Sequence, residues 1–172
     1  HVSSRRQRQM CIRDRNMKVI TRFAPSPTGY LHIGGVRTAL FNFVFAKKNN
    51  GTFLVRIEDT DKERSEDKYI DAIREGLAWI GLNPDEEPIK QSDRYDVYKN
   101  EANRLVEEGK AYLDEGAIRL KVNKEGSTHV KDLVYGEIEF VNKELDDLVI
   151  LRSDSSPTYH FCNVIDDNFQ NV

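Results

Sequence analysis

The chain has 172 residues, of which 26 are Lys or Arg and 29 are Asp or Glu, so its formal net charge is −3. That length suits one domain of ordinary size, or one domain that carries an insertion. No apolar run approaches the roughly 18 residues of a membrane span, so we expect no membrane-spanning helix and no membrane partner. Two Cys are too few for a disulfide scaffold or for a Cys-only zinc site, which needs about four ligands. The slight acidity argues against a protein that holds nucleic acid by bulk charge alone.

The first sixteen residues differ from the rest of the chain. They carry five Arg and one Asp, a net +4, so the −3 of the whole chain leaves −7 for residues 17–172. The segment lacks the apolar run of a secretory signal and shows no periodic apolar face. One interpretation is a basic arm that binds nucleic acid. The interpretation we favour is a cloning or gene-calling remnant outside the fold, with Met17 as the natural start.

A strand, a helix and a second strand follow one another early in the chain. Val19–Ala24 is typical of a short strand, which the two following prolines end because proline cannot donate to a strand ladder. A helix is expected to open at His32–Gly35 and to run over Val36–Lys48. Phe53–Ile57 is a near-continuous apolar run, typical of a buried parallel strand. This order predicts a right-handed βαβ unit and therefore an α/β fold. The helical spacing predicts an inner helix face made of Ala39, Leu40, Phe43 and Val44.

The second half of the chain has a different pattern. Two further helices are predicted, from about Ser65 to Ile80 and from about Arg94 to Glu108, each followed by a glycine. We expect a hairpin joint at Gly136-Glu137, a small β-rich insertion over about 111–147, and a return of Pro157–Val164 to the main sheet. The short strand candidates are Ile118–Val122, Leu133–Tyr135, Ile138–Val141 and Val149–Leu151.

Polar residues follow each predicted element at one edge of the expected sheet, and ligands of open α/β sheets bind beyond the carboxyl ends of the strands. A helix start offers unpaired N–H groups, and two glycines let a phosphate approach the backbone. A histidine there can donate a hydrogen bond to a phosphate oxygen on which charge grows in a transition state. The residues concerned are Arg22, Ser26, His32, Gly34, Gly35, Glu58, Asp59 and Asp61.

Each of these residues also has a purely structural interpretation. His32 could serve only as the entry residue of the helix, and Gly34-Gly35 could serve only tight packing of the helix on the sheet. The acidic run 58–61 could be a solvated turn. Arg22 could simply pair with Glu58 across the sheet edge. The combination, in order and on one edge, is what favours a functional site.

Longer motifs carry a resemblance to a known family. Pro27–Gly35 (PTGYLHIGG) resembles the ATP-binding signature of the class I aminoacyl-tRNA synthetases. Arg22–Asn42, followed by Arg56–Asp61 (RIEDTD), resembles the glutamyl-tRNA synthetases of the bacterial type. Further similar segments are Gln91–Tyr98, Gly109–Tyr112, Asp132–Phe140 and Leu145–Asp167. The resemblance implies a Rossmann-like nucleotide-binding domain, incomplete in this chain, with a small β-rich insertion that resembles the part binding the tRNA acceptor stem.

The family reaction has two steps. ATP-dependent activation of glutamate gives glutamyl-adenylate and pyrophosphate, and the glutamyl group then passes to the 3′-terminal adenosine of tRNA(Glu). The motifs imply an ATP site with His32 and the glycine pair as catalytic residues, a glutamate site, and two candidates for contact with the tRNA acceptor. These sets are Pro25, Thr28, Gly29, His32, Gly34 and Gly35 for ATP, Arg22, Ala24, Ser26, Glu58, Tyr159 and Asn163 for glutamate, and Asp59 and Asp61 for tRNA.

The chain also departs from the family pattern. The second ATP motif, a Lys-Ser-Lys-like loop, is absent, as are a later pocket arginine and the anticodon-binding part. The stretch between Tyr112 and Ala117 is shorter than in the family. We therefore expect an amino-terminal fragment without aminoacylation activity of its own. The implied domains are 17–110 and 148–172, the first half and the start of the second half of the catalytic domain, with the insertion at 111–147 between them.

The implied ligands are L-glutamate, ATP with Mg²⁺ and tRNA(Glu), for a cytoplasmic and monomeric enzyme with no protein-held metal and no zinc. Three alternatives stay open. A glutamyl-queuosine tRNA(Asp) synthetase is similar but usually carries a Cys-rich zinc site, whereas only Cys162 lies in the expected fold. A non-catalytic module that binds the tRNA acceptor is the second alternative. A nucleotidylyltransferase of the same superfamily is the third.

Overall fold

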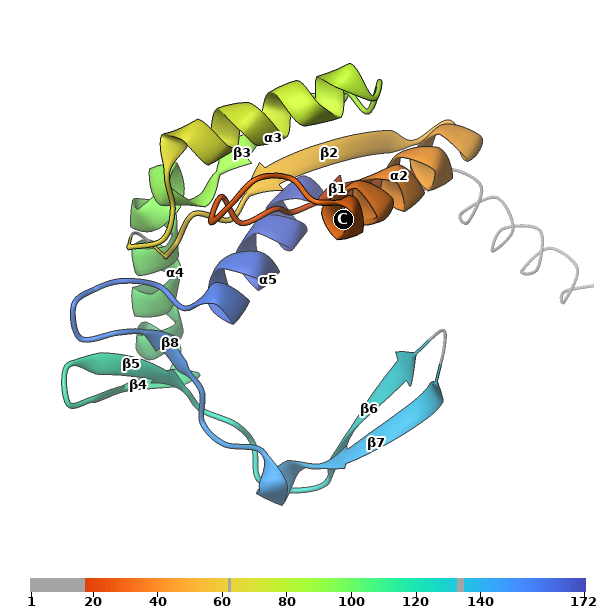
Figure 1. The fold of residues 1–172 in the computed structure, drawn as a ribbon. Coiled ribbons are helices and arrows are strands. Elements are labelled where there is room, and N and C mark those ends of the chain that lie inside the picture. The colour runs from red at the N-terminus through yellow and green to blue at the C-terminus, as the bar shows by residue number, and fades with distance from the viewer. Residues whose placement is uncertain (1–17, 62, 133–134) are drawn as a thin grey trace, which may run out of the picture. The chain divides into compact units, whose positions relative to one another are not determined.

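A computed structural model describes residues 18–61, 63–132 and 135–172, so the basic segment 1–16 lies outside the described residues. The elements form two compact units (Figure 1). The first contains the residues through Asp93 together with Asp167–Val172, and the second contains Arg94–Asp166. None of the described helices has the length and apolar character needed to span a membrane.

The first unit contains the predicted βαβ arrangement. β1 (Ile20–Phe23) and β2 (Thr52–Ile57) pair in parallel, and α2 (Ile33–Lys48) connects them. β3 (Ile89–Lys90), which the sequence pattern did not predict, adds in parallel to β2 and gives the sheet order β1-β2-β3. All six residues of β2 are buried. The expectation of an α/β fold is therefore confirmed.

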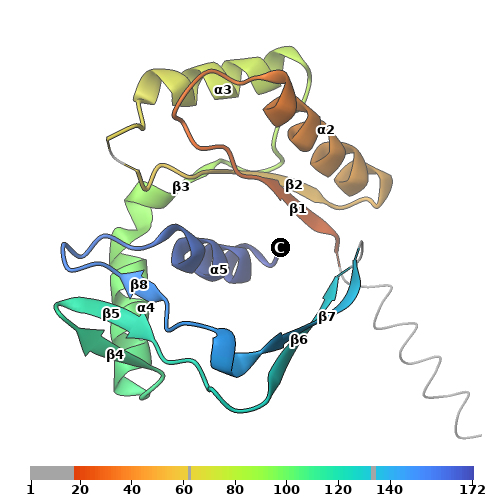
Figure 2. The same cartoon turned by 60° about the horizontal axis from the view of Figure 1, so that its bottom comes forward.

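Two helices lie on the same side of this sheet (Figure 2). α3 (Asp67–Trp79) buries Ile70, Ile73 and Leu77, as its helical spacing predicts. In α2 the buried residues are Ala39 and Ala46, with Phe43 packed against the core. Leu40 and Val44 are about half exposed, so the predicted inner face was wrong for these two residues. Alanines at i and i+7 bring the helix close to the sheet, which turns the neighbouring larger side chains outward.

The second unit has a helix against an antiparallel sheet. α4 (Tyr95–Glu107) follows the short helix η1 (Gln91–Arg94), and the sheet has the order β4-β5-β8. Tyr98, Ala102, Ile118, Leu151 and Phe161 are among its core residues. The strands are β4 (Ala111–Asp114), β5 (Ala117–Leu120) and β8 (Val149–Leu151), and a separate hairpin pairs β6 (Ser127–Asp132) with β7 (Gly136–Val141), followed by the short helix η2 (Asn142–Glu144).

Two local predictions for this unit were wrong, and a third falls mostly outside the described residues. Gly136-Glu137 was expected to join a hairpin but lies within β7. Its partner strand β6 is mostly polar and shows little apolar alternation, so the sequence pattern did not reveal this pairing. Of the strand expected at 133–135, residues 133 and 134 lie outside the described residues. Pro157–Val164 forms no strand, since α5 (Tyr159–Gln170) begins there. The burial of Phe161, Cys162 and Asp166 in α5 follows helical spacing.

The stretch that looked short in the sequence is closed by a tight turn. Asp114 of β4 pairs with Ala117 of β5, so only Glu115 and Gly116 lie between the strands. Both have positive φ, 48° and 84°, as a type I′ turn requires. A two-residue turn of this type matches the twist of the strands that it joins. The chain therefore forms a regular hairpin without a longer segment at this point.

Candidate functional site

His32 is the N-cap residue of α2. Its Nδ1 accepts a hydrogen bond from the backbone N–H of Gly34 at 3.1 Å, and the side chain is exposed. In the neutral ring this assigns the remaining proton to Nε2, which becomes a hydrogen-bond donor. The helix-entry interpretation of His32 is thus confirmed, and the same geometry leaves a donor atom on the opposite side of the ring.

The two glycines that follow His32 have packing roles. A Cβ on Gly34 would lie 2.8 Å from Cε1 of His32, so the imidazole occupies the space that a side chain would need. A Cβ on Gly35 would lie 3.0 Å from Cδ1 of Leu31, a side chain that packs against the first core. The helix–sheet packing interpretation is confirmed for Gly35, where an added Cβ would also lie 3.6 Å from Cζ of Phe23 in β1, but not for exposed Gly34, which makes room only for the His32 ring. Their contact with a phosphate stays a prediction.

The loop between β1 and α2 is tied to the neighbouring strand and helix. The carbonyl of Pro25 accepts from the N–H of Glu58 at 3.0 Å, and the carbonyl of buried Pro27 accepts from the N–H of Glu66 at 3.1 Å. These bonds hold the loop at the carboxyl edge of the sheet. Most of the remaining predicted loop residues are accessible: Ser26 and Thr28 are exposed, and Ala24 and Gly29 are partly buried.

Arg22 and Glu58 meet in a cluster of charged side chains. Nε and Nη2 of Arg22 donate to the two oxygens of Asp167 at 2.6 and 3.0 Å. The guanidinium of Arg56, fully buried in β2, donates through Nη1 to Asp167 at 2.6 Å and through Nη2 to Glu58 at 3.0 Å. We call Arg22, Arg56, Glu58 and Asp167 the four-charge cluster. The structure thus links the two predicted glutamate-binding residues through two residues that the sequence pattern did not single out.

The four-charge cluster pairs two arginines with two carboxylates and favours the ionised form of Asp167. Burial alone would raise the pKa of Asp167, but the hydrogen bonds and positive charges of Arg22 and Arg56 outweigh it and lower the pKa. Glu58 is 4% exposed and lies beside Arg56. A buried carboxylate of this kind requires a paired cation. The site therefore presents fixed charges of both signs at the carboxyl ends of β1 and β2.

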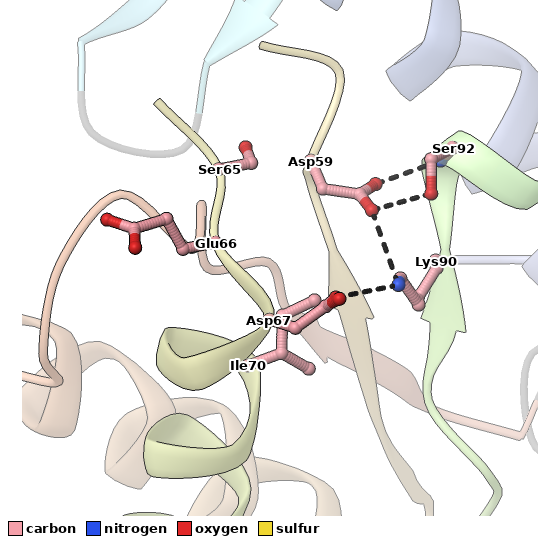
Figure 3. A pocket seen from close by; sticks show the side chains of 7 residues that line it. All are labelled: Asp59, Ser65, Glu66, Asp67, Ile70, Lys90 and Ser92. Carbon is pink, nitrogen blue, oxygen red and sulfur yellow. Dashed lines mark hydrogen bonds and ion pairs between the residues drawn. The ribbon is translucent and has the colours of Figure 1, made fainter. Parts of the chain in front are cut away.

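The interpretation of residues 58–61 as a solvated turn is wrong at Asp59, which is buried. Asp59 is 6% exposed and accepts from the backbone N–H of Ser92 at 2.8 Å and from its Oγ at 2.6 Å. Lys90 lies between Asp59 and Asp67, at 3.9 and 3.4 Å, in the hollow shown in Figure 3. Nε of Arg64 donates to Asp61 at 2.7 Å, and this hydrogen bond lowers the pKa of Asp61.

Over residues 18–61, 63–132 and 135–172, no group of three or more His, Cys, Asp or Glu could hold a metal ion.

Tyr159 and Asn163 lie on the first two turns of α5, in the second unit. Tyr159 is about half exposed, and its ring makes an edge contact with His160 at 5.3 Å between centroids. Asn163 is partly buried. The part of these two residues in a glutamate site stays a prediction.

Sequence reasoning missed three charged groups, of which Arg56 and Asp166 are fully buried and the side chain of Asp167 is 31% exposed. Arg56 could have been recognised from the sequence, because it is the one charged residue within the apolar run of β2 and a buried charge needs a partner. For Asp167 and Asp166 the sequence carried no such signal. Asp166 is fully buried in the second unit and accepts from the hydroxyl of Tyr98 at 2.7 Å and from Nε of Arg94 at 2.9 Å. Burial and the neighbouring Asp166 raise the pKa of Tyr98.

Comparison with known proteins gives one consistent result. A family model described as the catalytic domain of class I tRNA synthetases (E and Q) matches residues 18–117 and 114–172. Glutamate–tRNA ligases from Thermodesulfovibrio yellowstonii and Syntrophotalea carbinolica are 49% and 45% identical over 185 and 187 residues, or 87% of this chain. The chain spans about 40% of the length of these relatives. A solved glutamate tRNA ligase from Elizabethkingia meningosepticum, crystallised in complex with its amino acid, has a TM-score of 0.82 and 33% identity, covering 90% of this chain and 42% of that chain.

These matches also bear on the short stretch after α4. The two segments of the family match meet at residues 114–117, where the two-residue turn joins β4 to β5. The alignment with the Thermodesulfovibrio protein covers 185 positions, more than the 172 residues of the whole chain, so that relative carries residues that this chain lacks. The prediction that the chain is short between Tyr112 and Ala117 agrees with both findings.

Proposed function

Because the chain belongs to the class I tRNA synthetases of the glutamate and glutamine type, we propose that it forms the first part of the catalytic domain of a glutamate–tRNA ligase. The observation that carries this proposal is the four-charge cluster, which joins Arg22 to Glu58 at the sheet edge where α2 also begins. The substrates are L-glutamate, ATP and tRNA(Glu).

The amino acid is held by charges of both signs. The guanidinium fork of Arg22 suits the side-chain carboxylate of glutamate, and Glu58 suits the substrate ammonium. A neutral glutamine amide cannot match the charge-assisted bonds to Arg22. The loss of such a bond in a dry pocket costs about 1–3 kcal/mol, or roughly 10–100-fold in selectivity. Ala24, Ser26, Tyr159 and Asn163 complete the proposed glutamate site.

Activation is an electrostatic task for the start of α2. The α-carboxylate of glutamate attacks the α-phosphate of ATP, the bond to the leaving pyrophosphate breaks, and glutamyl-adenylate forms. Nε2–H of His32 and the first N–H groups of α2 stabilise the negative charge that grows on the phosphate oxygens. The remaining residues of the proposed ATP site line the space that ATP occupies. They are Pro25, Thr28, Gly29, Gly34 and Gly35. Mg²⁺ enters with ATP as part of the substrate.

Transfer to tRNA completes the proposed reaction. A ribose hydroxyl of the terminal adenosine attacks the glutamyl carbonyl and AMP leaves. We propose that Asp59 and Asp61 lie on the side of the site that receives the tRNA acceptor end. Asp59 would act indirectly, because it accepts a hydrogen bond from the backbone N–H of Ser92 and so fixes that segment. We assign residues 17–110 and 148–172 to the catalytic domain and 111–147 to an acceptor-binding insertion. We also propose a monomeric, cytoplasmic enzyme.

The proposal is tested in a fusion of family length. Residues 18–172 replace the matching part of the Thermodesulfovibrio glutamate–tRNA ligase, which supplies the remaining part of the protein. We expect glutamate-dependent ATP–pyrophosphate exchange in the presence of tRNA and charging of tRNA(Glu), with glutamine and aspartate at least tenfold poorer. The 172-residue chain alone should not charge tRNA. A fusion that prefers glutamine or aspartate would overturn the proposed substrate.

A further inference from the structure

We propose that Asp167 and Arg56 are positioning residues for the amino-acid site. They hold the guanidinium of Arg22 and the carboxylate of Glu58 in their binding orientations before glutamate arrives. This inference rests on the proposed function. It adds two residues, 111 positions apart in the sequence, to the machinery that selects the substrate.

Asp167 binds Arg22 through a bidentate ion pair with a defined geometry. Both carboxylate oxygens accept, one from Nε and the other from Nη2, so the plane of the guanidinium is fixed by two parallel bonds. A guanidinium carries five N–H groups, and a substrate carboxylate needs a fork of two of them. Without Asp167 the long Arg22 side chain would have to be ordered by the substrate itself, at the expense of affinity.

Arg56 extends the same control to Glu58. Its guanidinium is fully buried and touches Asp167 with one nitrogen and Glu58 with the other, at 2.6 and 3.0 Å. Nη1 also lies 3.3 Å from Oε1 of Gln170, one turn further along α5. Because β2 is buried along its whole length, Arg56 has little room to move. The rigid strand therefore sets the position of both carboxylates.

The chain offers a matched control next to Asp167. Asp166 is a carboxylate of the same helix. It accepts from one arginine, Arg94, and from the hydroxyl of Tyr98 in the second unit, whereas Asp167 accepts from two arginines. A change at Asp166 removes an ion pair whose carboxylate is more deeply buried than that of Asp167, without touching Arg22 or Glu58. The pair thus separates positioning of the amino-acid site from a general loss of stability.

The experiment measures dissociation constants of the 172-residue chain for L-glutamate and for ATP, by NMR titration at pH 7. Asp167→Asn keeps the shape of the side chain and removes its charge. We expect the glutamate dissociation constant to rise about tenfold, the size of one weakened charge-assisted bond, and the ATP constant to change less than twofold. Asp167→Glu should restore part of the glutamate affinity. Asp166→Asn should lower the melting temperature and leave the ratio of the two constants unchanged.

The possible results separate the two proposals. One result is that the unchanged chain binds ATP and yet shows no binding of glutamate, even when the glutamate concentration is 50-fold above the ATP concentration that saturates the chain. In that case the proposed amino-acid site is wrong, and this inference falls with it. If the unchanged chain binds glutamate but Asp167→Asn weakens both ligands equally or neither, positioning is wrong and the glutamate site stands. Should Asp167→Asn fail to fold, Asp167→Glu alone decides, because a purely structural role predicts equal changes for both ligands.

Discussion

The two units bury charge in different places. In the first unit the buried charged residues Arg56, Glu58 and Asp59 lie in β2 or directly after it, at the edge where ligands of parallel sheets bind. In the second unit the buried charge among the described residues is Asp166, which ties the start of α4 to α5 through Arg94 and Tyr98. Burial of a charge therefore does not by itself mark a site. A position at the carboxyl edge of a parallel sheet is the feature that favours a site.

The sheet type explains the difference. A strand of a parallel sheet is covered on both faces, so a charge within it must be paired inside the protein. The antiparallel sheet of the second unit has exposed positions such as Tyr112 and Leu113, where polar groups can meet water. The second unit therefore needs buried ion pairs only where its helices meet.

The largest effect should follow from Arg56→Met. The change leaves Glu58 and Asp167 without their shared cation, and removal of one partner from a buried ion pair costs about 3–5 kcal/mol. Urea unfolding at pH 7 measures the loss. A cost no greater than that of an exposed pair, such as Arg104→Ala next to Glu101, would contradict the central place of Arg56 in the first unit.

The corresponding change in the second unit is Tyr98→Phe, which removes the hydroxyl that donates to Asp166. A hydrogen bond to a charged group contributes about 1.5–3 kcal/mol, so we expect a cost in this range because Asp166 keeps Arg94. Tyr112→Phe is the matched control, since its hydroxyl donates to Asp147 at an exposed position. Equal unfolding midpoints for the two variants would show that Asp166 is not the anchor described above.

Acid should weaken the first unit through Asp167. Its folded pKa lies below its unfolded value, so its contribution is present above the unfolded pKa, near pH 4, and is lost as the pH falls through the folded pKa. The urea midpoint of the unchanged chain should therefore fall more between pH 5 and pH 3 than that of Asp167→Asn. Parallel pH curves would mean that the ion pairs of Asp167 contribute nothing to folding.

The smallest effect is a gain, at the turn of the second unit. Glu115 has φ of 48°, a conformation that costs most residues about 1 kcal/mol but suits Asn. Glu115→Asn should raise stability by about 0.5–1 kcal/mol in urea unfolding. Glu125→Asn, outside any positive-φ position, serves as the control. A loss of stability would show that the chain does not close β4 and β5 with a type I′ turn.

Local sequence signals predicted the elements but not all of their faces and partners. The βαβ unit and the inner face of α3 followed from periodicity. Arg22 was named from its place at the end of the first strand and Glu58 from its place directly after the second. The outward turn of Leu40 depends on two alanines that let α2 approach the sheet, a tertiary effect. Asp167 lies 145 positions from Arg22, and no local pattern encodes such a pairing. The polar strand β6 gave too little alternation to be recognised.

In the proposed site, Arg22, His32 and Glu58 serve one ligand, and this joint role can be measured. It is tested most directly by titration of the isotope-labelled chain with a stable glutamyl-adenylate analogue whose phosphate is replaced by a sulfamoyl group, monitored at these three residues by NMR. All three residues are expected to respond with one shared dissociation constant, and the glutaminyl analogue is expected to bind at least tenfold more weakly. Separate constants for His32 and for the Arg22–Glu58 pair, or equal affinity for the two analogues, would contradict it.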